Sequence, residues 1–560
     1  MRRGALAASL SAIVALATTW PWARDPTRAL GARDLEAADH LWALWLGSVD
    51  GPLIAQTTRV GSPEGYTWVL GDPAHVPVFA MGHLIGGAGS GLGVVHLLSL
   101  ALAALAGWCW ARDLWPERPD IAVLAAPLAA AAPGLGVGLV TGMTEAQPLG
   151  MTALALLALH AAARDGGVAR SVVCALAFGA LPWFGAYPAL YGILLAPIVL
   201  FWGLARGPDR SRRLAMVLGA AVTAALLSAP VLTAVLSVRD LGLPGGTALT
   251  PQVLAAPDLP RNRMLGADLL GLVLPGAGLH PTGVHGAYLG LGAVLTAGVG
   301  MASRAHRRAL PVVLVIVAGT LSLGFTLQAG GAVVRFGDAP LLAPAGALSL
   351  LIEDLGRAPR WTRMAALASI LLAPLAAAGL DALTQRFPPG LRLTLLGGTL
   401  GLLLVDATVL GPAPFPRPTF DPKPPVEVRS LDGAGAWLEV PPPRFSTAMP
   451  ETGGGPRARL RHPTLVWQTG HGKALSGNPH QAGLPEGEGE RMAHALLAAA
   501  RADDRPGVAA GCSAAGDAGF GWIVSWRGVS TSDERAALVG SLGPPAVDGP
   551  ALVAWPVPCR

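Results

Sequence analysis

The sequence predicts a mainly α-helical, polytopic membrane protein with a C-terminal α/β domain outside the membrane. Three observations support this fold class. Of the 560 residues, 52% are hydrophobic and only 13% are charged, with a mean hydropathy of +0.50. About eleven apolar runs approach the length that a helix needs to cross a bilayer. After residue 411 the chain becomes polar, which marks a separate domain.

The basic residues favour membrane topology over nucleic-acid binding. The sequence pI is about 9.4, but the arginines stand in short clusters between apolar runs and form no continuous basic face. Such clusters are typical of cytoplasmic connections between spans. We therefore expect the lipid bilayer as a partner and expect no nucleic acid.

The apolar runs predict a transmembrane domain over residues 1–411. Arginines precede the first run and no small-residue cleavage site follows it, so we expect an uncleaved span with a cytoplasmic N-terminus. The stretch LPWFGAYP at 181–188 is interpreted as a break that divides 171–204 into two spans. The predicted spans are 5–22, 92–111, 121–142, 146–163, 171–184, 188–204, 214–236, 287–302, 310–327, 363–384 and 391–411.

The distribution of arginine agrees with this order of spans. Every predicted inside connection contains arginine, as the positive-inside rule requires. If 171–204 were a single span, the basic cluster RAHRR at 304–308 would face outward instead. The outer side then holds a first loop over 23–91 and two later loops. The predicted inside connections are Arg112–Arg118, Arg164–Arg170, Arg206–Arg213, Arg304–Arg308 and Gln385–Arg392.

The C-terminal part is predicted to be an extracytoplasmic α/β domain over 426–560, joined by a proline-rich linker over 412–425. Two segments have the composition of strands and two have that of helices, the second helix with a Ser/Thr cap ahead of acids. These are WIVSW (522–526), ALVAW (551–555), ERMAHALLAAARA (490–502) and SDERAALVGSL (532–542).

The four cysteines divide between the two domains. Cys109 and Cys174 fall in predicted spans, where cysteine acts as a small apolar residue. Cys512 and Cys559 fall in the outer domain, where an oxidising compartment permits a disulfide that pins the C-terminus. No Cys or His pair has zinc-ligand spacing.

The stretch RDLEAADHLWALWLG at 33–47 is the first candidate for chemistry. On a helix, Glu36, Asp39 and His40 lie beside an apolar stripe that includes two tryptophans. One interpretation is an amphipathic helix on the outer interface, with tryptophans as headgroup anchors. The other is that the acids and the histidine carry a reaction.

Two further acids stand near the predicted outer ends of spans. Asp72 lies in GDPAH (71–75), and Glu145 lies in TEAQPLG (144–150) between two spans. An acid so close to the membrane is costly unless it has a partner or a task. A structural alternative for Glu145 is a place in the first turn of the next helix, capped by Thr144.

Five motifs, in this order along nearly the whole chain, resemble the GT-C glycosyltransferases. The resemblance is closest to a large group of uncharacterised bacterial GT-C-like membrane proteins. Their shared order is a first span, an acidic helix in the first outer loop, many further spans and a C-terminal domain outside the membrane. The motifs are DHLWALW (39–45), PEGYTWVLGDP (63–73), TGMTE (141–145), APRWTRM (358–364) and WQTGHGKALSG (467–477).

The resemblance implies transfer of a sugar from a polyprenyl-phosphate donor to a glycan, lipid or protein acceptor. The reaction would take place at the outer face of a bacterial inner membrane. In GT-C enzymes an acid of the first outer loop acts as the general base or binds a metal. By this analogy Asp39 is the base, with Glu36 or Asp34 assisting and His40 beside it. A second acid adjacent to Asp39, common in the family, is missing here, and a divalent metal stays open as a cofactor.

The resemblance also suggests substrate contacts. Asp72 and Glu145 are candidates for substrate binding, and the leaving lipid phosphate needs a cation, for which Arg360 and Arg363 are candidates. The alternative interpretation of Arg360 and Arg363 is that they lie at the membrane interface, with their side chains extending to the lipid headgroups. His471 and Lys473 would contact a carrier pyrophosphate or an acceptor sugar, unless they form only a surface turn.

Two other functions remain open at this point. One is a non-catalytic GT-C-like protein that binds or positions a lipid-linked glycan. A transporter is less favoured, because charged residues gather at the outer ends of spans and few lie at mid-bilayer depth.

Overall fold

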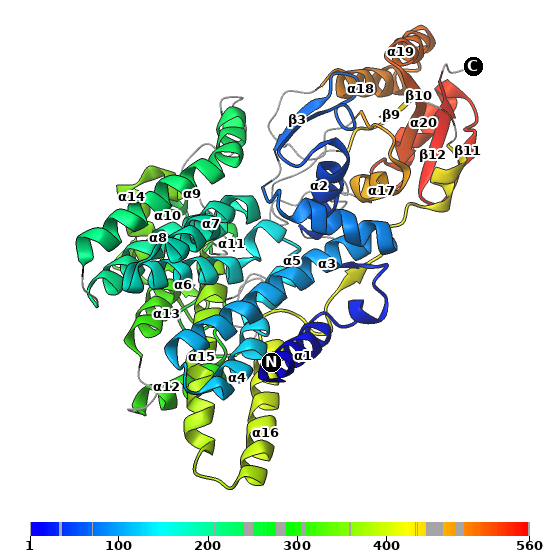
Figure 1. The fold of residues 1–560 in the computed structure, drawn as a ribbon. Coiled ribbons are helices and arrows are strands. Elements are labelled where there is room, and N and C mark those ends of the chain that lie inside the picture. Colours follow the sequence, from blue (N-terminus) through cyan, green and yellow to red (C-terminus); the bar gives the residue numbers. More distant parts are fainter. Residues whose placement is uncertain are drawn as a thin grey trace.

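The computed structural model describes most of the chain. The described residues are 2–32, 36–69, 71–206, 209–239, 250–258, 260–263, 265–275, 287–303, 308–357, 360–431, 433, 435–443, 463–476 and 487–557. They form a helical bundle and an α/β unit that contacts one end of the bundle (Figure 1).

Each of the eleven predicted spans contains helix, which confirms the predicted polytopic helical fold. By length and composition, six helical segments in the described parts of the chain are able to cross a membrane, and four shorter helices are also apolar. The bundle consists of α1 (Arg2–Thr18), α3 (His75–Leu114), α4 (Pro119–Ala130), α5 (Pro133–Thr141), α6 (Leu149–Asp165), α7 (Val168–Phe184), α8 (Ala186–Leu204), α9 (Arg210–Arg239), α12 (Leu291–Ala302), α13 (Ala309–Ser322), α15 (Met364–Thr384) and α16 (Pro389–Thr408).

Helix α15 lies in the interior of this bundle. It is almost entirely buried and packs against α3, α4, α12 and α13. Small residues permit this close packing, as is usual between membrane helices. A Cβ atom on Gly379 of α15 would lie 1.7 Å from the carbonyl oxygen of Thr296 in α12, so only glycine fits there.

Two glycine breaks shape the bundle. Helix α3 is interrupted at Gly86 and Gly87, where Gly87 has a φ of +79°. The other break is at Gly185, where φ is +142° and α7 gives way to α8. The predicted interruption within 181–188 is therefore present, and two helices occupy 171–204.

Helix α2 (Ala37–Asp50) and the hairpin of β2 (Ile54–Thr57) and β3 (Tyr66–Val69) lie between α1 and α3. The apolar stripe predicted for this segment is buried: Trp42 is fully buried and Trp45 nearly so. Both tryptophans belong to a core shared with the C-terminal unit. Helix α2 is therefore not an interfacial helix with its tryptophans among the lipid headgroups.

The C-terminal unit is built on a four-stranded sheet of order β11-β12-β10-β9, in which β9 pairs parallel to β10 and the other pairs are antiparallel. Strands β10 and β12 and helices α18 and α20 correspond to the four predicted segments. Its elements are β9 (Ala436–Glu439), α17 (Pro463–His471), α18 (Glu488–Arg501), α19 (Arg505–Asp517), β10 (Phe520–Trp526), α20 (Ser532–Leu542), β11 (Val547–Asp548) and β12 (Leu552–Pro556).

The linker also pairs with the loop after α1. Strand β1 (Ala29–Leu30) pairs antiparallel with β8 (Thr419–Phe420). The remaining short elements are η1 (Trp22–Arg24), η2 (Thr144–Ala146), α10 (Thr250–Ala255), α11 (Pro260–Arg263), β4 (Gln328–Ala329), β5 (Ala332–Val333), β6 (Arg335–Phe336), β7 (Ala339–Pro340), α14 (Pro344–Leu351), η4 (Glu353–Arg357), η5 (Trp361–Arg363) and η6 (Val426–Ser430).

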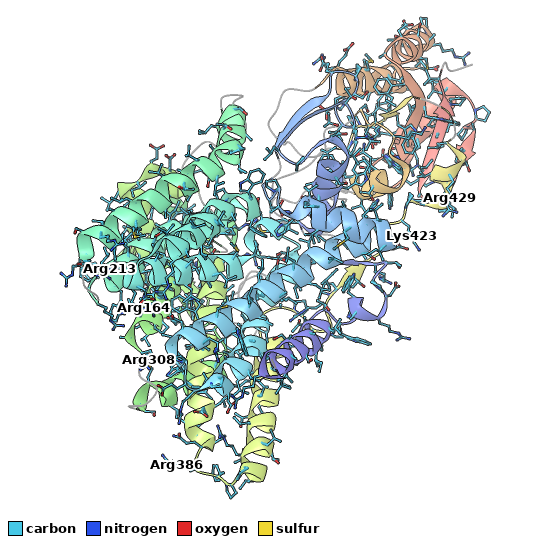
Figure 2. The ribbon with its side chains drawn as sticks, in the orientation of Figure 1. Arg164, Arg213, Arg308, Arg386, Lys423 and Arg429 are labelled. Carbon is cyan, nitrogen blue, oxygen red and sulfur yellow. The ribbon has the colours of Figure 1, made fainter. Side chains whose placement is uncertain are left out.

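Basic residues of the predicted inside connections lie at one end of the bundle. Figure 2 shows Arg164, Arg213, Arg308 and Arg386 at the end of the bundle that is away from the C-terminal unit. Arg429 lies on the C-terminal unit itself. This arrangement agrees with the predicted topology, although the orientation of the termini stays a prediction.

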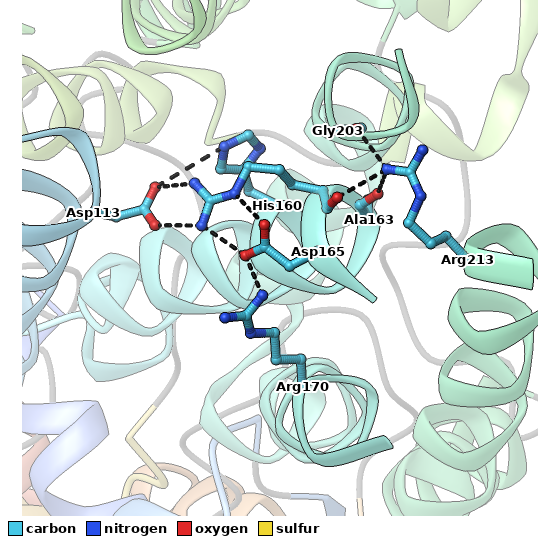
Figure 3. Close-up of polar contacts among 8 residues, drawn as sticks. Asp113, His160, Ala163, Asp165, Arg170, Gly203 and Arg213 are labelled. Carbon is cyan, nitrogen blue, oxygen red and sulfur yellow. Dashed lines mark hydrogen bonds and ion pairs between the residues drawn. The ribbon is translucent and has the colours of Figure 1, made fainter. Parts of the chain in front are cut away.

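Several of these arginines also hold helix ends together (Figure 3). Arg164 makes two hydrogen bonds to the Asp113 carboxylate at the end of α3, at 2.9 and 3.0 Å, and also contacts Asp165. Arg170 of α7 pairs with the same Asp165. Arg213 of α9 donates to carbonyls at the ends of α6 and α8. The network links the ends of five helices, α3, α6, α7, α8 and α9, where the predicted inside connections meet.

Candidate functional site

An ion pair links the start of α2 to the start of α15. Glu36 is the N-cap residue of α2, and its carboxylate contacts the Arg360 guanidinium just before η5. The side chains of Glu36 and Arg360 are 22% and 15% exposed, so the pair is shielded but still reached from outside. Sequence positions 324 residues apart thus meet at one end of the bundle.

The turn between α5 and α6 forms the floor of the site. Thr144 Oγ1 lies 3.0 Å from His40 Nδ1 on α2, so this hydroxyl contacts the histidine and is not a helix cap. Gln147 Oε1 lies 2.7 Å from His96 Nδ1 on α3, and its amide nitrogen donates to the Gly138 carbonyl. These contacts tie the turn to α2, α3 and α5.

Glu145 is held between Thr144 and Gln147 on this turn. Two glycines make room for it: a Cβ on Gly71 would lie 2.3 Å from its Oε2, and a Cβ on Gly185 would lie 2.3 Å from its backbone oxygen. Burial raises the pKa of Glu145, with the Asp72 and Glu36 carboxylates acting in the same direction and His40 and Arg360 opposing them. Glu145 is therefore an acid that protonates more readily than usual.

Asp72 and His75 form a buried pair at the start of α3. Asp72 Oδ2 lies 2.8 Å from His75 Nδ1, and both side chains are almost completely inaccessible. Such a contact orients the imidazole and selects its tautomer. Phe184 at the end of α7 meets the His75 ring edge-on at 5.6 Å between ring centres.

Arg363 completes the polar end of α15. It is buried and donates to Thr141 Oγ1 at the end of α5, at 2.9 Å. The Tyr191 hydroxyl of α8 donates to the Arg360 carbonyl, which fixes the backbone between the two arginines. Neither arginine snorkels towards open surface, because both side chains are mostly or fully enclosed by protein.

The fold that carries this site matches solved membrane glycosyltransferases. Arabinofuranosyltransferase AftD from Mycobacteria matches 99% of this chain at 16% sequence identity with a TM-score of 0.51, and its R1389S mutant matches at 0.52. The chain has the GT-C fold. Identity this low shows a shared fold and says nothing of substrates.

The GT-C likeness extends over only part of the mycobacterial enzyme, because the chain spans about 40% of the length of AftD. Two other GT-C structures match less closely. ArnT from Cupriavidus metallidurans has a TM-score of 0.47 at 13% identity, over 99% of this chain and 97% of ArnT. The oligosaccharyltransferase AglB from Archaeoglobus fulgidus has a TM-score of 0.43 at 13% identity, over 95% and 71%. No protein-family model and no curated protein matches the sequence.

Most of the predicted site residues meet at one place in this GT-C fold. Asp39 lies partly buried in the first turn of α2, one turn beyond Glu36. The residues that the structure brings together at this end of the bundle are Glu36, Asp39, His40, Asp72, Glu145, Arg360 and Arg363. The partners His75, His96 and Gln147 were not predicted from the sequence, although His75 stands in GDPAH and Gln147 in TEAQPLG.

The His-Gly-Lys turn lies elsewhere, at the end of α17 in the C-terminal unit, which packs against α2. His471 stacks on Trp437 at 4.2 Å between ring centres, and burial lowers its pKa to about 3, so it is neutral near pH 7. The Lys473 ammonium donates to the Gly433 carbonyl. Both residues thus have structural partners, and their predicted contact with substrate stays a prediction.

Gln468 anchors the same turn to α2. Its Oε1 accepts from Trp42 Nε1 at 2.7 Å, and its amide nitrogen donates to the carbonyls of Arg59 and Lys473. The amide is fully buried, so each of its polar atoms needs such a partner. The QTGHGK motif therefore joins the C-terminal unit to α2.

Two other predictions concern a metal ion and a disulfide. Within the described ranges, no cluster of three or more His, Cys, Asp or Glu residues is placed to hold a metal ion, and metal dependence stays open. Cys512 is buried in α19, whereas Cys559 and Asp34 lie outside the described residues. The Cys512–Cys559 disulfide stays a prediction.

Proposed function

We propose that the chain is a membrane glycosyltransferase that moves a sugar from a polyprenyl-phosphate donor to an acceptor on the outer face of the inner membrane. The observation that carries the proposal is the meeting of Glu36, Glu145 and Arg360 at the end of a GT-C bundle. Carboxylates and an enclosed arginine are the two kinds of group that the reaction needs.

The chemistry assigns each kind of group a task. An acceptor hydroxyl oxygen forms a bond to the anomeric carbon while the bond from that carbon to the phosphate oxygen breaks. The hydroxyl proton passes to a carboxylate, for which Asp39 is the first candidate and Glu36 or Glu145 the second. The phosphate leaves with the electron pair of the broken bond, and Arg360 is the cation that we propose to stabilise its charge.

A non-catalytic glycan-binding protein is the second candidate. It is favoured by the ion pair itself, because Arg360 in this structure already neutralises Glu36. In that case the same arginine binds the lipid phosphate and no carboxylate accepts a proton. The two functions differ in what happens when a carboxylate becomes an amide of the same shape.

Mass spectrometry of lipid-linked and surface glycans tests both functions in a strain that lacks the native gene. Asp39→Asn, Glu36→Gln and Arg360→Met are compared with wild type at equal protein level, with Asp421→Asn in the exposed linker as the control. We expect loss of one glycan species in Asp39→Asn and Arg360→Met and no change in the control. Glycans that vanish in the deletion strain but persist in all carboxylate variants would favour the binding protein.

A further inference from the structure

The segment between α13 and α15 contains an uncharged, apolar run. It is too short to span a membrane and too apolar for a loop in water. Residues 341–352, LLAPAGALSLLI, have no charged side chain, and Asp338 and Glu353 flank them. As helix they would reach about 18 Å, well short of the roughly 30 Å hydrocarbon core. An apolar run of this length is typical of a buried core helix or of an interfacial segment.

The burial pattern of α14 excludes a core helix. Its small residues Ala345, Gly346 and Ser349 face the protein, and a Cβ on Gly346 would lie 2.1 Å from the Phe325 carbonyl oxygen. Its large residues face outward instead: Leu351 is 81% exposed and Leu350 is 56% exposed. A helix in water buries leucine and exposes serine, so this inverted pattern fits apolar surroundings.

Neighbouring elements extend the same surface. Phe336 on the hairpin of β6 and β7 is 87% exposed, and Leu341 and Leu342 beside it are partly exposed. Two of the nearby charged groups have partners within the protein: Arg335 pairs with Asp258, and the Asp268 carboxylate accepts four backbone N–H groups. Short hairpins with satisfied polar groups are tolerated near the membrane surface but not deep in lipid.

We propose that the α14 surface, made of Phe336, Leu341, Leu342, Leu350, Leu351 and Ile352, lies in the bilayer interface, with its side chains among the acyl chains just below the headgroups. The surface is continuous with the bundle, because α14 packs on α13, whose Ile316 is 59% exposed. From Ile352 the chain leads through η4 to Arg360. The bilayer contact would thus set the height of Arg360 relative to the headgroup plane.

Nitroxide quenching of single labelled cysteines tests the α14 surface without any knowledge of substrate. The full-length protein, with all four native cysteines replaced by alanine, receives Phe336→Cys or Leu351→Cys. It is labelled with an environment-sensitive fluorophore and placed in phosphatidylcholine nanodiscs. The nanodiscs carry a nitroxide either near the headgroup or near the end of the acyl chain. We expect loss of fluorescence at both positions, and a greater loss with the nitroxide near the headgroup.

Two control positions of similar exposure give the quenching expected for a side chain in lipid and for one in water. Leu402→Cys, 71% exposed on α16, is expected to be quenched by lipid nitroxides, and Val426→Cys, 72% exposed in η6, is not. If Phe336→Cys and Leu351→Cys resemble Val426→Cys, the surface faces water and the proposal is wrong. Blue-shifted emission without quenching would mean that protein covers the surface, which also overturns it. Leu350→Cys and Leu342→Cys replace a variant that fails to fold.

Discussion

Among the single side chains, Glu145 and the Glu36–Arg360 pair carry the chemistry that we propose for the site. Glu36 is neutralised by an arginine, whereas Glu145 lies among other acids and has a raised pKa. Two carboxyl groups in different environments, one paired with an arginine and one buried with a raised pKa, are typical of acid–base chemistry. Asp39, the acid favoured by family resemblance, shares the first turn of α2 with His40 and stays the first candidate for the base.

The raised pKa of Glu145 predicts a pH-dependent cost to stability. Its ordinary pKa is 4.5, and folding raises it, so the folded chain binds the proton more tightly than the unfolded chain. The contribution of Glu145 to stability is therefore greatest below its ordinary pKa and is lost as pH rises through the raised pKa. Glu145→Gln cannot ionise, so we expect its thermal midpoint to exceed that of wild type by a margin that is larger at about pH 7 than at about pH 4.

Thermal unfolding in detergent at the two pH values measures this margin. Glu117→Gln, an exposed acid between α3 and α4, serves as the matched control. A margin for Glu145→Gln that does not grow with pH would show that its carboxyl is not held in a proton-retaining environment.

At the scale of helices and loops, buried arginines donate hydrogen bonds to backbone carbonyls at helix ends. Arg417 in the linker donates to the carbonyls of Thr18 at the end of α1 and Thr408 at the end of α16. It also donates to the carbonyls of Ala413 and Pro414. Helix C-termini carry unpaired carbonyls and partial negative charge, so a cation there is stabilising.

Arg417→Ala would leave these carbonyls without their donor. The side chain is buried, and burial lowers its pKa only to about 10, so it is charged at neutral pH. We expect a loss of unfolding free energy on the order of 2–4 kcal/mol, because hydrogen bonds to a buried charge are lost. Denaturation in detergent measures the loss, with Arg429→Ala, an exposed arginine of η6, as the control. Equal stability of the two variants would contradict a fastening role.

In the whole molecule, the α/β unit and the segment between α1 and α3 share one core. Trp42, Leu44 and Val60 pack with Trp437 and Trp526 across the two parts. The linker strand β8 adds backbone pairing to β1. The C-terminal unit is therefore joined to the site-bearing helix α2 through buried apolar contacts and through Gln468.

Deletion of residues 426–560 is expected to expose this shared core. Uncovered tryptophan and leucine side chains in water cause self-association, so the shortened protein should elute as aggregate in size-exclusion chromatography in detergent. The full-length chain with Arg429→Ala, at an exposed position of η6, serves as the control. A monodisperse shortened protein with normal helix content would show that α2 folds without the C-terminal unit.

Sequence alone determined the features that depend on local composition and period. Apolar runs predict bundle helices because a helix in lipid must be apolar along its whole length, and all eleven runs contain helix. The strands at 522–526 and 551–555 and the cap ahead of α20 follow from side-chain preference and local hydrogen bonding. The acids at the ends of spans were recognised as candidates because a charged group near the membrane is costly unless it has a partner or a function.

Only the tertiary structure decided which of these residues meet. The pairing of Glu36 with Arg360 and of His96 with Gln147 depends on how helices cross, which no local pattern encodes. The same is true of Trp42, which sequence alone allows as a lipid anchor and which the fold buries against the C-terminal unit. A side chain's neighbours are set by long-range packing of small residues between helices, and that packing is a property of the folded bundle.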